Sequence, residues 1–448
     1  MAPFGLDRHE WWKEQTIYQI YPSSFQDSNG DGWGDIKGIT RRLDYLRELG
    51  ADTLWSSPFL KSPRVDMGYD ISDFKGIDPS YGTMEDVDNL LAELKKRHMR
   101  MLMDLVVNHT SDQHAWFRES RSSLKNSKRD WYIWKKPKMV GKDGTPQPPN
   151  NWSQILGEAS SAWNYDEITG EYYLGLFTPE QPDLNWENPE VRQAVYDVMH
   201  FWLKKGASGF RMDVINLISK VTTYPDAEKT LGDDHEFHPG NKFFVNGPRF
   251  HEYMQEMNRE VLSKYDCYTV GESPGVSDLD EILRCVEANA GELNTQFIFD
   301  LVDMDFVPGA VRMALHPWDV KRMKSIITKY QRAMIERDGW NTVFIENHDN
   351  PRSVSRFTDD SDRYRDKGAK LLALMQTTLS GTLFVYQGEE IGMRNVPKEW
   401  DIEEYKDIES INFWKKSLQK YGDDPKKMAE ARDILEKKAR DNSRTPMQ

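Results

Sequence analysis

Cysteine is scarce in this sequence, which contains only Cys267 and Cys285 among its 448 residues. Two cysteines provide no disulfide framework, and their spacing along the chain does not match a metal-binding motif. The sequence also lacks any run approaching the roughly 20 apolar residues that a membrane span needs. Residues 1–15 have no apolar segment of the signal-peptide type. We therefore expect a soluble, cytoplasmic protein with no membrane partner.

Basic residues are outnumbered by acidic ones, 59 against 73, and the formal net charge of −14 disfavours a polyanionic partner such as nucleic acid. A neutral substrate meets no such penalty. The sequence has no tandem repeat, and its 38% hydrophobic and 29% charged residues exclude a collagenous or wholly disordered chain. A chain of this length suits a large barrel that carries an insertion.

Short apolar segments with strand character alternate with segments of helical periodicity. The expected strands are 17–25, 51–59, 100–108, 209–214, 267–272, a segment near 297–300, 341–345 and 381–386. The expected helices between them are 39–49, 84–98, 189–205, 249–264, 321–337 and 364–379. Eight strands separated by helices predict the α/β class and a (β/α)₈ TIM barrel.

The alternation stops between residues 110 and 184, a stretch that is rich in tryptophan. A loop of that length without structure of its own is improbable, so we expect a small inserted domain after the third strand. The predicted organisation is a first barrel part at 1–109, the inserted domain at 110–184, a second barrel part at 185–399 and a C-terminal helical extension at 400–448.

Residues 27–35 read Asp-Ser-Asn-Gly-Asp-Gly-Trp-Gly-Asp. Oxygen-bearing side chains at alternate positions, with glycines that let the loop fold back, can surround a hard cation such as calcium. An EF-hand loop would carry glutamate at its twelfth position, where this chain has Gly38. A solvated turn is the alternative, and a metal here would be structural.

Ionisable side chains stand at the carboxyl ends of four predicted strands: His109, Asp213, Glu272, and the pair His348 and Asp349. The active site of a (β/α)₈ barrel lies at that end of the strands. Any one of these residues could be an ordinary polar group, but burying all of them without a task would cost several kcal/mol. Zinc ligation is the rival use, and no HxxxH or CxxC spacing supports it.

Arg211 and Asp213 are two positions apart on one strand, so their side chains leave the same face. An ordinary ion pair is one interpretation. Alternatively, the arginine keeps Asp213 ionised as a nucleophile. Two carboxylates about 5–5.5 Å apart cleave a glycosidic bond with retention. Glu272, protonated because of the nearby anion, would then be the acid/base, and Asp349 would oppose the positive charge of the transition state.

Four motifs resemble the conserved regions of the α-amylase superfamily, glycoside hydrolase family 13: Asp-Leu-Val-Val-Asn-His109, Gly-Phe-Arg-Met-Asp213, Val-Gly-Glu272 and Glu-Asn-His-Asp349. Residues 181–188 and 440–448 resemble the oligo-1,6-glucosidase and α-glucosidase branch. The resemblance implies the nucleophile, acid/base and stabiliser roles just given. It also implies that the terminal glucose is held by Asp66, Tyr69, His109, Phe177, Arg211, His348 and Arg440.

The same resemblance implies a calcium or magnesium site formed by Asp27, Asn29, Asp31, Asp35 and the carbonyl of Trp33, and no organic cofactor. Family members continue past Gln448 into a C-terminal β-domain, which we expect to be absent here. We also expect a monomer that acts on oligosaccharides.

Val214 follows the predicted nucleophile, and in similar enzymes valine here accompanies activity on α-1,6 links. The resulting hypothesis is a retaining, exo-acting α-glucosidase that prefers isomaltose-like substrates. The alternatives are an α-1,4 maltase, a sucrose isomerase or transglucosidase, and a non-catalytic truncated scaffold.

Overall fold

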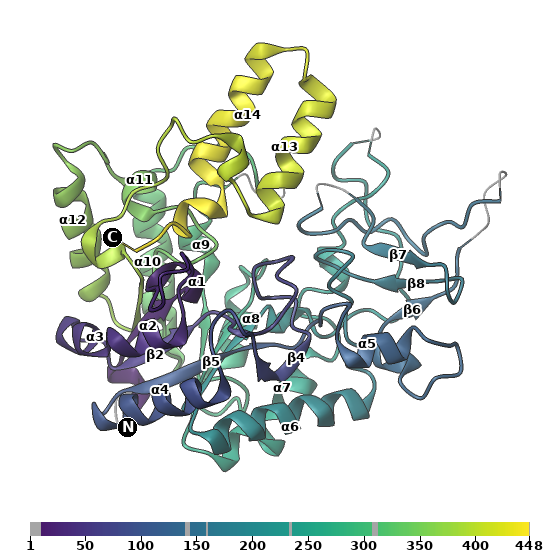
Figure 1. Ribbon diagram of the computed structural model, residues 1–448, viewed down its shortest axis with the longest axis horizontal. Helices are drawn as coiled ribbons and strands as arrows, with labels where there is room; N and C mark the ends of the chain where they lie inside the picture. Colours follow the sequence, from purple (N-terminus) through teal and green to yellow (C-terminus); the bar gives the residue numbers. More distant parts are fainter. Residues whose placement is uncertain (1–9, 139–143, 158–159, 233–234, 307–311, 448) are drawn as a thin grey trace.

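The computed structural model describes residues 10–138, 144–157, 160–232, 235–306 and 312–447. Eight strands form one parallel sheet in the order β11-β10-β9-β5-β2-β1-β13-β12 (Figure 1). Their bounds are β1 Thr16–Ile20, β2 Thr53–Ser56, β5 Arg100–Val106, β9 Gly209–Asp213, β10 Tyr268–Glu272, β11 Thr295–Phe297, β12 Thr342–Val343 and β13 Thr382–Tyr386. The Thr342 hydroxyl donates to the Gln296 carbonyl at 3.0 Å, which brings the two edge strands together and nearly closes the barrel.

Helices follow the strands and cover the outside of the sheet (Figure 1). They are α2 Ile36–Arg41, α3 Leu43–Leu49, α4 Met84–Lys96, α6 Pro189–Lys205, α7 Phe250–Glu260, α8 Leu279–Val286, α10 Val320–Glu336 and α12 Arg365–Thr377. Local sequence sets their ends. Helix α6, for example, begins with an Asn188 cap and Pro189 at its first position, and it ends at Gly206 in a left-handed conformation.

The barrel interior is apolar at one end and charged at the other. At the apolar end, side chains from the strands and from just beyond them form one buried cluster: Ile17, Trp55, Leu102, Tyr268, Val270, Phe297, Phe344 and Phe384. Strand β9 contributes Arg211 instead, and its guanidinium lies 5.1 Å from the centre of the Trp55 ring. The aromatic layer therefore supports the polar end of the barrel from below.

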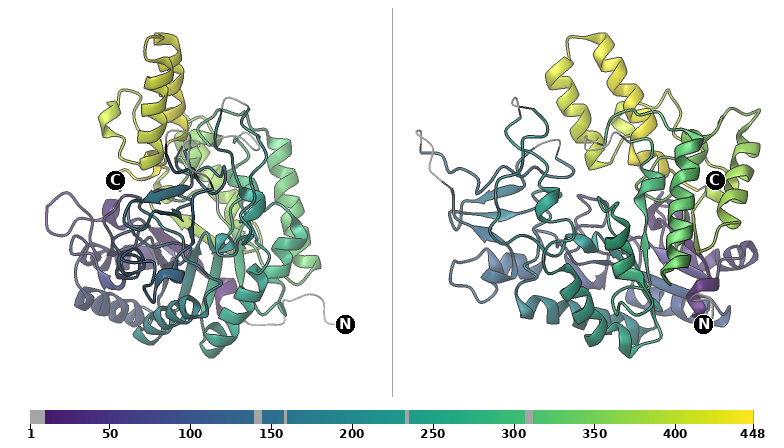
Figure 2. Two further views of the ribbon diagram at one scale, coloured as in Figure 1. Left: turned by 90° about the vertical axis from the view of Figure 1, so that its right-hand side faces the viewer. Right: turned by 180° about the vertical axis from the view of Figure 1, so that it is seen from behind.

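Two further parts flank this barrel (Figures 1 and 2). A three-stranded antiparallel sheet contains β6 Trp134–Lys135, β8 Glu171–Leu174 and β7 Trp163–Asp166, in that order. Helices α13 Ile408–Tyr421 and α14 Pro425–Lys438 form a hairpin that stands away from the barrel. The Asn412 amide of α13 donates to the Leu156 carbonyl at 3.0 Å, so the hairpin touches the 110–184 stretch.

The predicted strands are longer than the observed ones, and two of them run into helices. The segment 17–25 is a strand only to Ile20, after which Pro22–Phe25 forms helix α1. Proline has no N–H for a sheet, and its fixed φ suits the first turn of a helix. The sixth strand is Thr295–Phe297 rather than 297–300, because Phe299–Val302 turns into helix α9. The mostly apolar residues 297–300 suggested a strand that starts too late, because the strand itself begins with polar residues such as Thr295. The Thr295 hydroxyl pairs with the Tyr268 hydroxyl.

Helices α13 and α14 lie within residues 400–448. None of the helices in the described ranges has the length and hydropathy of a membrane span.

Gly209 allows β9 to lie against β10. It has φ of +144°, and a Cβ at this position would lie 1.8 Å from the carbonyl oxygen of Tyr268. We expect Gly209→Ala to lower the free energy of unfolding by at least about 3 kcal/mol, because the strand that carries Arg211 and Asp213 must shift. Guanidinium unfolding followed by circular dichroism measures this.

The matched control is Gly50→Ala. Gly50 also has a positive φ, +100°, but nothing lies within 4 Å of a Cβ there. Gly50→Ala should lower the free energy of unfolding by only about 1 kcal/mol, because alanine disfavours this backbone conformation. Equal losses in the two variants would contradict the close approach of β9 to β10.

Candidate active site

Three carboxylates surround the buried guanidinium of Arg211. Its Nη1 donates to Asp213 Oδ1 at 2.7 Å and to Asp104 Oδ1 at 3.0 Å, and its Nη2 lies 2.6 Å from Glu272 Oε2. The register of the parallel strands causes this convergence, because Arg211 of β9 stands between Asp104 of β5 and Val270 of β10. This is more than the ordinary ion pair that the spacing of Arg211 and Asp213 also allowed.

The pKa of Asp213 differs from the prediction. Burial raises it well above its usual range, and although Arg211 acts against this shift, the charges of Glu272 and Asp104 add to it. Arg211 thus acts in the predicted direction, but burial outweighs it, because one guanidinium is shared among three acids. Burial also raises the pKa of Asp104, to about 6. The protonated state of Glu272 stays a prediction.

Asp349 lies in a contrasting environment just beyond β12. Its Oδ1 accepts from Arg440 at 3.2 Å and from Arg444 at 2.9 Å. Burial would raise the pKa of Asp349, but neighbouring positive charge outweighs it and holds the pKa far below its usual range. The neighbouring groups that lower it are His348, whose Nε2 lies 3.0 Å from Asp349 Oδ2, and then Arg440, Arg444 and Arg312. Asp349 is consequently an anion.

The predicted sugar-binding side chains join these two groups of charges. Tyr69 links them, since its hydroxyl contacts His348 Nε2 at 2.6 Å and Asp104 Oδ2 at 3.1 Å. Asp66 Oδ1 accepts from Arg440 Nη2 at 3.0 Å. The His109 ring lies 3.1 Å from the Tyr69 carbonyl and 5.0 Å, between ring centres, from Phe177. All the predicted sugar ligands thus gather at one end of the barrel.

Val214 bends the chain directly after Asp213. It has φ of +35° and ψ of +40°, which is rare for a β-branched residue and stores strain of about 1–3 kcal/mol. The bend lets the Val214 N–H donate to Glu272 Oε2 at 3.0 Å. Its side chain is buried in a cluster with Leu217 and Trp152. The residue therefore joins the acid pair to the core of the inserted region.

Sequence reasoning missed several side chains that orient this site: Gln19, Asp104, Gln181, Asp407 and Arg444. Gln19 holds His348 Nδ1 at 2.8 Å, and Gln181 donates to Asp66 at 3.2 Å. Asp407 receives both Arg440 and Arg444, at 2.8 and 2.7 Å. For Gln19 and Asp104 a signal existed, because each is polar within an otherwise apolar strand. Asp407 lies in no motif and could not have been found this way.

The predicted metal ligands share one short loop. The Asp27 carboxylate accepts the backbone N–H groups of Asn29, Gly30 and Gly32, and these bonds lower the pKa of Asp27. Asp35 caps α2 through the Gly38 N–H at 2.6 Å. Asp27 Oδ1 accepts two of these bonds, whereas Asp27 Oδ2 accepts one and keeps a lone pair, and the oxygen-only donor set of the loop fits a hard cation.

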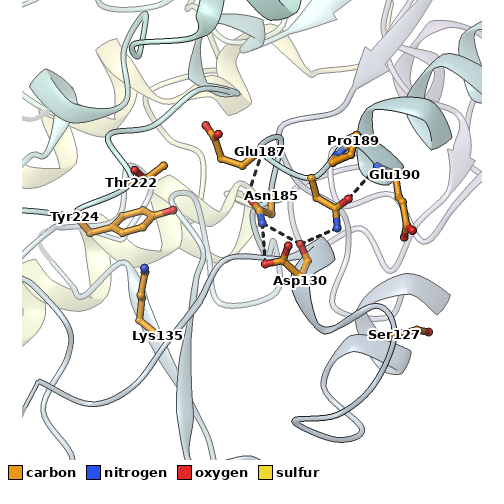
Figure 3. A pocket seen from close by; sticks show the side chains of 10 residues that line it. Ser127, Asp130, Lys135, Asn185, Glu187, Pro189, Glu190, Thr222 and Tyr224 are labelled. Carbon is orange, nitrogen blue, oxygen red and sulfur yellow. Dashed lines mark hydrogen bonds between the residues drawn. The ribbon is translucent and has the colours of Figure 1, made fainter.

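The described part of the chain also has a cavity of about 480 Å³ outside this site (Figure 3). Its lining includes Asp130, Asn185, Glu187 and Tyr224, and contains none of the predicted site residues. Its polar groups are engaged with one another, as where the Asn185 amide donates to Asp130 (Figure 3). Asp213, Glu272 and Asp349 do not line this cavity.

Comparison with known proteins agrees with this geometry. A family model described as "Alpha amylase, catalytic domain" matches residues 19–448. The chain is 52% identical over 438 residues to an oligo-1,6-glucosidase of Parageobacillus thermoglucosidasius, covering 98% of this chain and 75% of the relative. It is 48% identical over 447 residues to an α-glucosidase of Schizosaccharomyces pombe, covering 100% of this chain and 76% of the relative.

Among solved structures, a mutant isomaltulose synthase from Erwinia rhapontici NX5 in complex with sucrose superposes with a TM-score of 0.89. The two sequences are 44% identical, and the match covers 97% of this chain and 74% of the other.

Proposed function

Since the chain belongs to the α-amylase family and is a glycoside hydrolase, we propose that it is a retaining, exo-acting α-glucosidase. It removes the terminal α-linked glucose from short oligosaccharides and prefers α-1,6 links. One observation carries the proposal: Asp213 and Glu272 both contact Arg211, at 2.7 and 2.6 Å, so both acids face one small space.

The reaction divides the work between these two acids. Asp213 attacks the anomeric carbon as the bond to the leaving oxygen breaks, and Glu272 gives that oxygen a proton. Water then attacks the anomeric carbon, Glu272 takes a proton from it, and Asp213 leaves as a carboxylate. Besides burial, the charge of Glu272 raises the pKa of Asp213, so the two acids interact directly, as this division of roles requires.

The other charges complete the site around the sugar ring. Asp349 is an anion and opposes the positive charge that develops on the ring in the transition state. Arg440 contacts Asp66 at 3.0 Å and Asp349 at 3.2 Å. This buried group blocks one end of the site, which supports removal of single terminal units.

The test is to supply the purified chain with isomaltose, maltose and sucrose. Proton NMR should show that glucose is released first as the α-anomer, because two displacements retain configuration. Asp213→Asn should lower kcat at least about 10³-fold, while Asp88→Asn on the outer surface of α4 serves as control. Release of the β-anomer first, or an active Asp213→Asn variant, would refute the mechanism. Conversion of sucrose to an isomer would instead indicate the chemistry named for the isomaltulose synthase relative.

The α-1,6 preference is proposed to depend on the apolar side chain after the nucleophile. Val214→Thr should lower the ratio of kcat/KM for isomaltose to that for maltose about 10-fold, since the hydroxyl offers a partner to a different aglycone. Val214→Ala, which removes methyl groups without adding a hydroxyl, is the matched control. An unchanged ratio in Val214→Thr would remove the hypothesis.

Asp104 should set the acid limb of the pH profile. Its charge raises the pKa of Asp213, and Asp213 must be ionised to attack. Asp104→Asn should therefore lower that pKa and move the acid limb of kcat/KM to lower pH, with a smaller effect in Asp88→Asn. Initial rates on isomaltose across the acid range measure the limb, and a shift to higher pH would contradict the shared-guanidinium arrangement.

We also propose that the loop 27–35 binds calcium or magnesium through Asp27, Asn29, Asp31, Asp35 and the Trp33 carbonyl. The ion would neutralise three clustered carboxylates and tie the loop to α2. Chelation with EDTA should lower the melting temperature, and calcium at 100 times its Kd should restore about 2.7 kcal/mol. Asp31→Asn should abolish the calcium response. A response that persists in this variant would place the ion elsewhere.

A further inference from the structure

We propose that His251, Cys285 and Glu292 form a second metal site, which takes a zinc-class divalent ion. It lies outside the barrel, between α7, α8 and the segment that leads from α8 into β11. The ligand atoms His251 nitrogen, Cys285 Sγ and Glu292 carboxylate oxygen all lie within 4.8 Å of one another. Sequence spacing could not reveal this site, because its donors come from three separate segments.

The three donors lie within 4.8 Å of one another, and small side-chain shifts would give them the separations of a bound ion. Zinc bonds of 2.0–2.3 Å in a tetrahedron place neighbouring ligand atoms about 3.4–3.6 Å apart. His251 Nδ1 is already 2.9 Å from Glu292 Oε2. A set of one nitrogen, one sulfur and one oxygen is typical of zinc and cobalt, while calcium and magnesium take oxygen alone.

The surroundings orient these donors. The other nitrogen of the His251 ring, Nε2, contacts Glu281 Oε2 at 3.2 Å. A carboxylate on the far nitrogen is the usual partner of a metal-binding histidine, because it fixes the tautomer and the ring orientation. Gln255 donates to Glu292 Oε1 at 3.2 Å and restrains the carboxylate in the same manner.

The burial of Cys285 and Glu292 supports a shared metal ion, because buried polar groups need a partner. The side chain of Glu292 is 1% exposed, and Cys285 is fully buried. The simplest alternative is a buried ion pair of His251 and Glu292 with a bystander thiol. An ion would use all three donors.

Binding changes the proton count in a defined way. Zinc replaces the hydrogen of the Cys285 thiol, a zinc–thiolate bond forms and the proton passes to the buffer. The ion would then connect α7 to α8 and stabilise the segment between β10 and β11. No oxidant or reductant is needed.

The experiment titrates chelator-treated protein with Zn²⁺ against a competing chromophoric chelator, and with Co²⁺ under ultraviolet spectroscopy. We expect one tightly bound zinc that raises the melting temperature, and a thiolate-to-cobalt charge-transfer band. Cys285→Ser should lose the band and weaken zinc binding more than 100-fold. Cys267→Ser is the matched control and should keep both, because Cys267 lies outside the cluster. Glu281→Gln should weaken binding about 10- to 100-fold through the histidine.

His251→Asn provides an independent variant if Cys285→Ser folds poorly, and the circular dichroism of each variant checks folding. The proposal is overturned if zinc binds equally well to the wild type and to Cys285→Ser, since the ion would then sit at the 27–35 loop or among the active-site acids. It is also overturned if no tight binding or charge-transfer band occurs, in which case the cluster is an ion pair. Glycosidase activity does not enter these readouts.

Discussion

The shared guanidinium of Arg211 is the interaction on which the site depends. Three buried acids from β5, β9 and β10 could not stay close together without a cation, because burying unpaired charge costs several kcal/mol. Arg211 meets all three with two nitrogens, at 2.6–3.0 Å. Since its positive charge is divided among three acids, burial still raises the pKa of Asp213.

A pair of cations acts on another part of the site. Arg440 and Arg444 meet at Asp407 and reach Asp349. Here His348, Arg440, Arg444 and Arg312 all act on Asp349, and its pKa falls. Two aspartates of one site thus differ, since the pKa of Asp349 is lowered and that of Asp213 is raised. The balance between burial and the nearby charges at each carboxylate makes the difference.

Much of the fold was predictable from local patterns. The eight strands and the polar residues at their ends follow from apolar alternation and from the rule that barrel sites lie at the carboxyl ends. The errors occurred where local preference gave an ambiguous signal. Pro22 turned a strand end into a helix, and the polar start of β11 hid the sixth strand. The domain boundaries and the metal in the 27–35 loop stay predictions.

The sequence by itself determined which side chains share a strand face and which stand where a strand ends, because backbone geometry repeats every two residues. Only the tertiary structure decided how acids and cations are matched. The partners of Arg211, the coupling of Arg440 to Asp407 and the meeting of His251, Cys285 and Glu292 all join distant segments. Desolvation and Coulomb interactions depend on distance in space, and no local pattern records that distance.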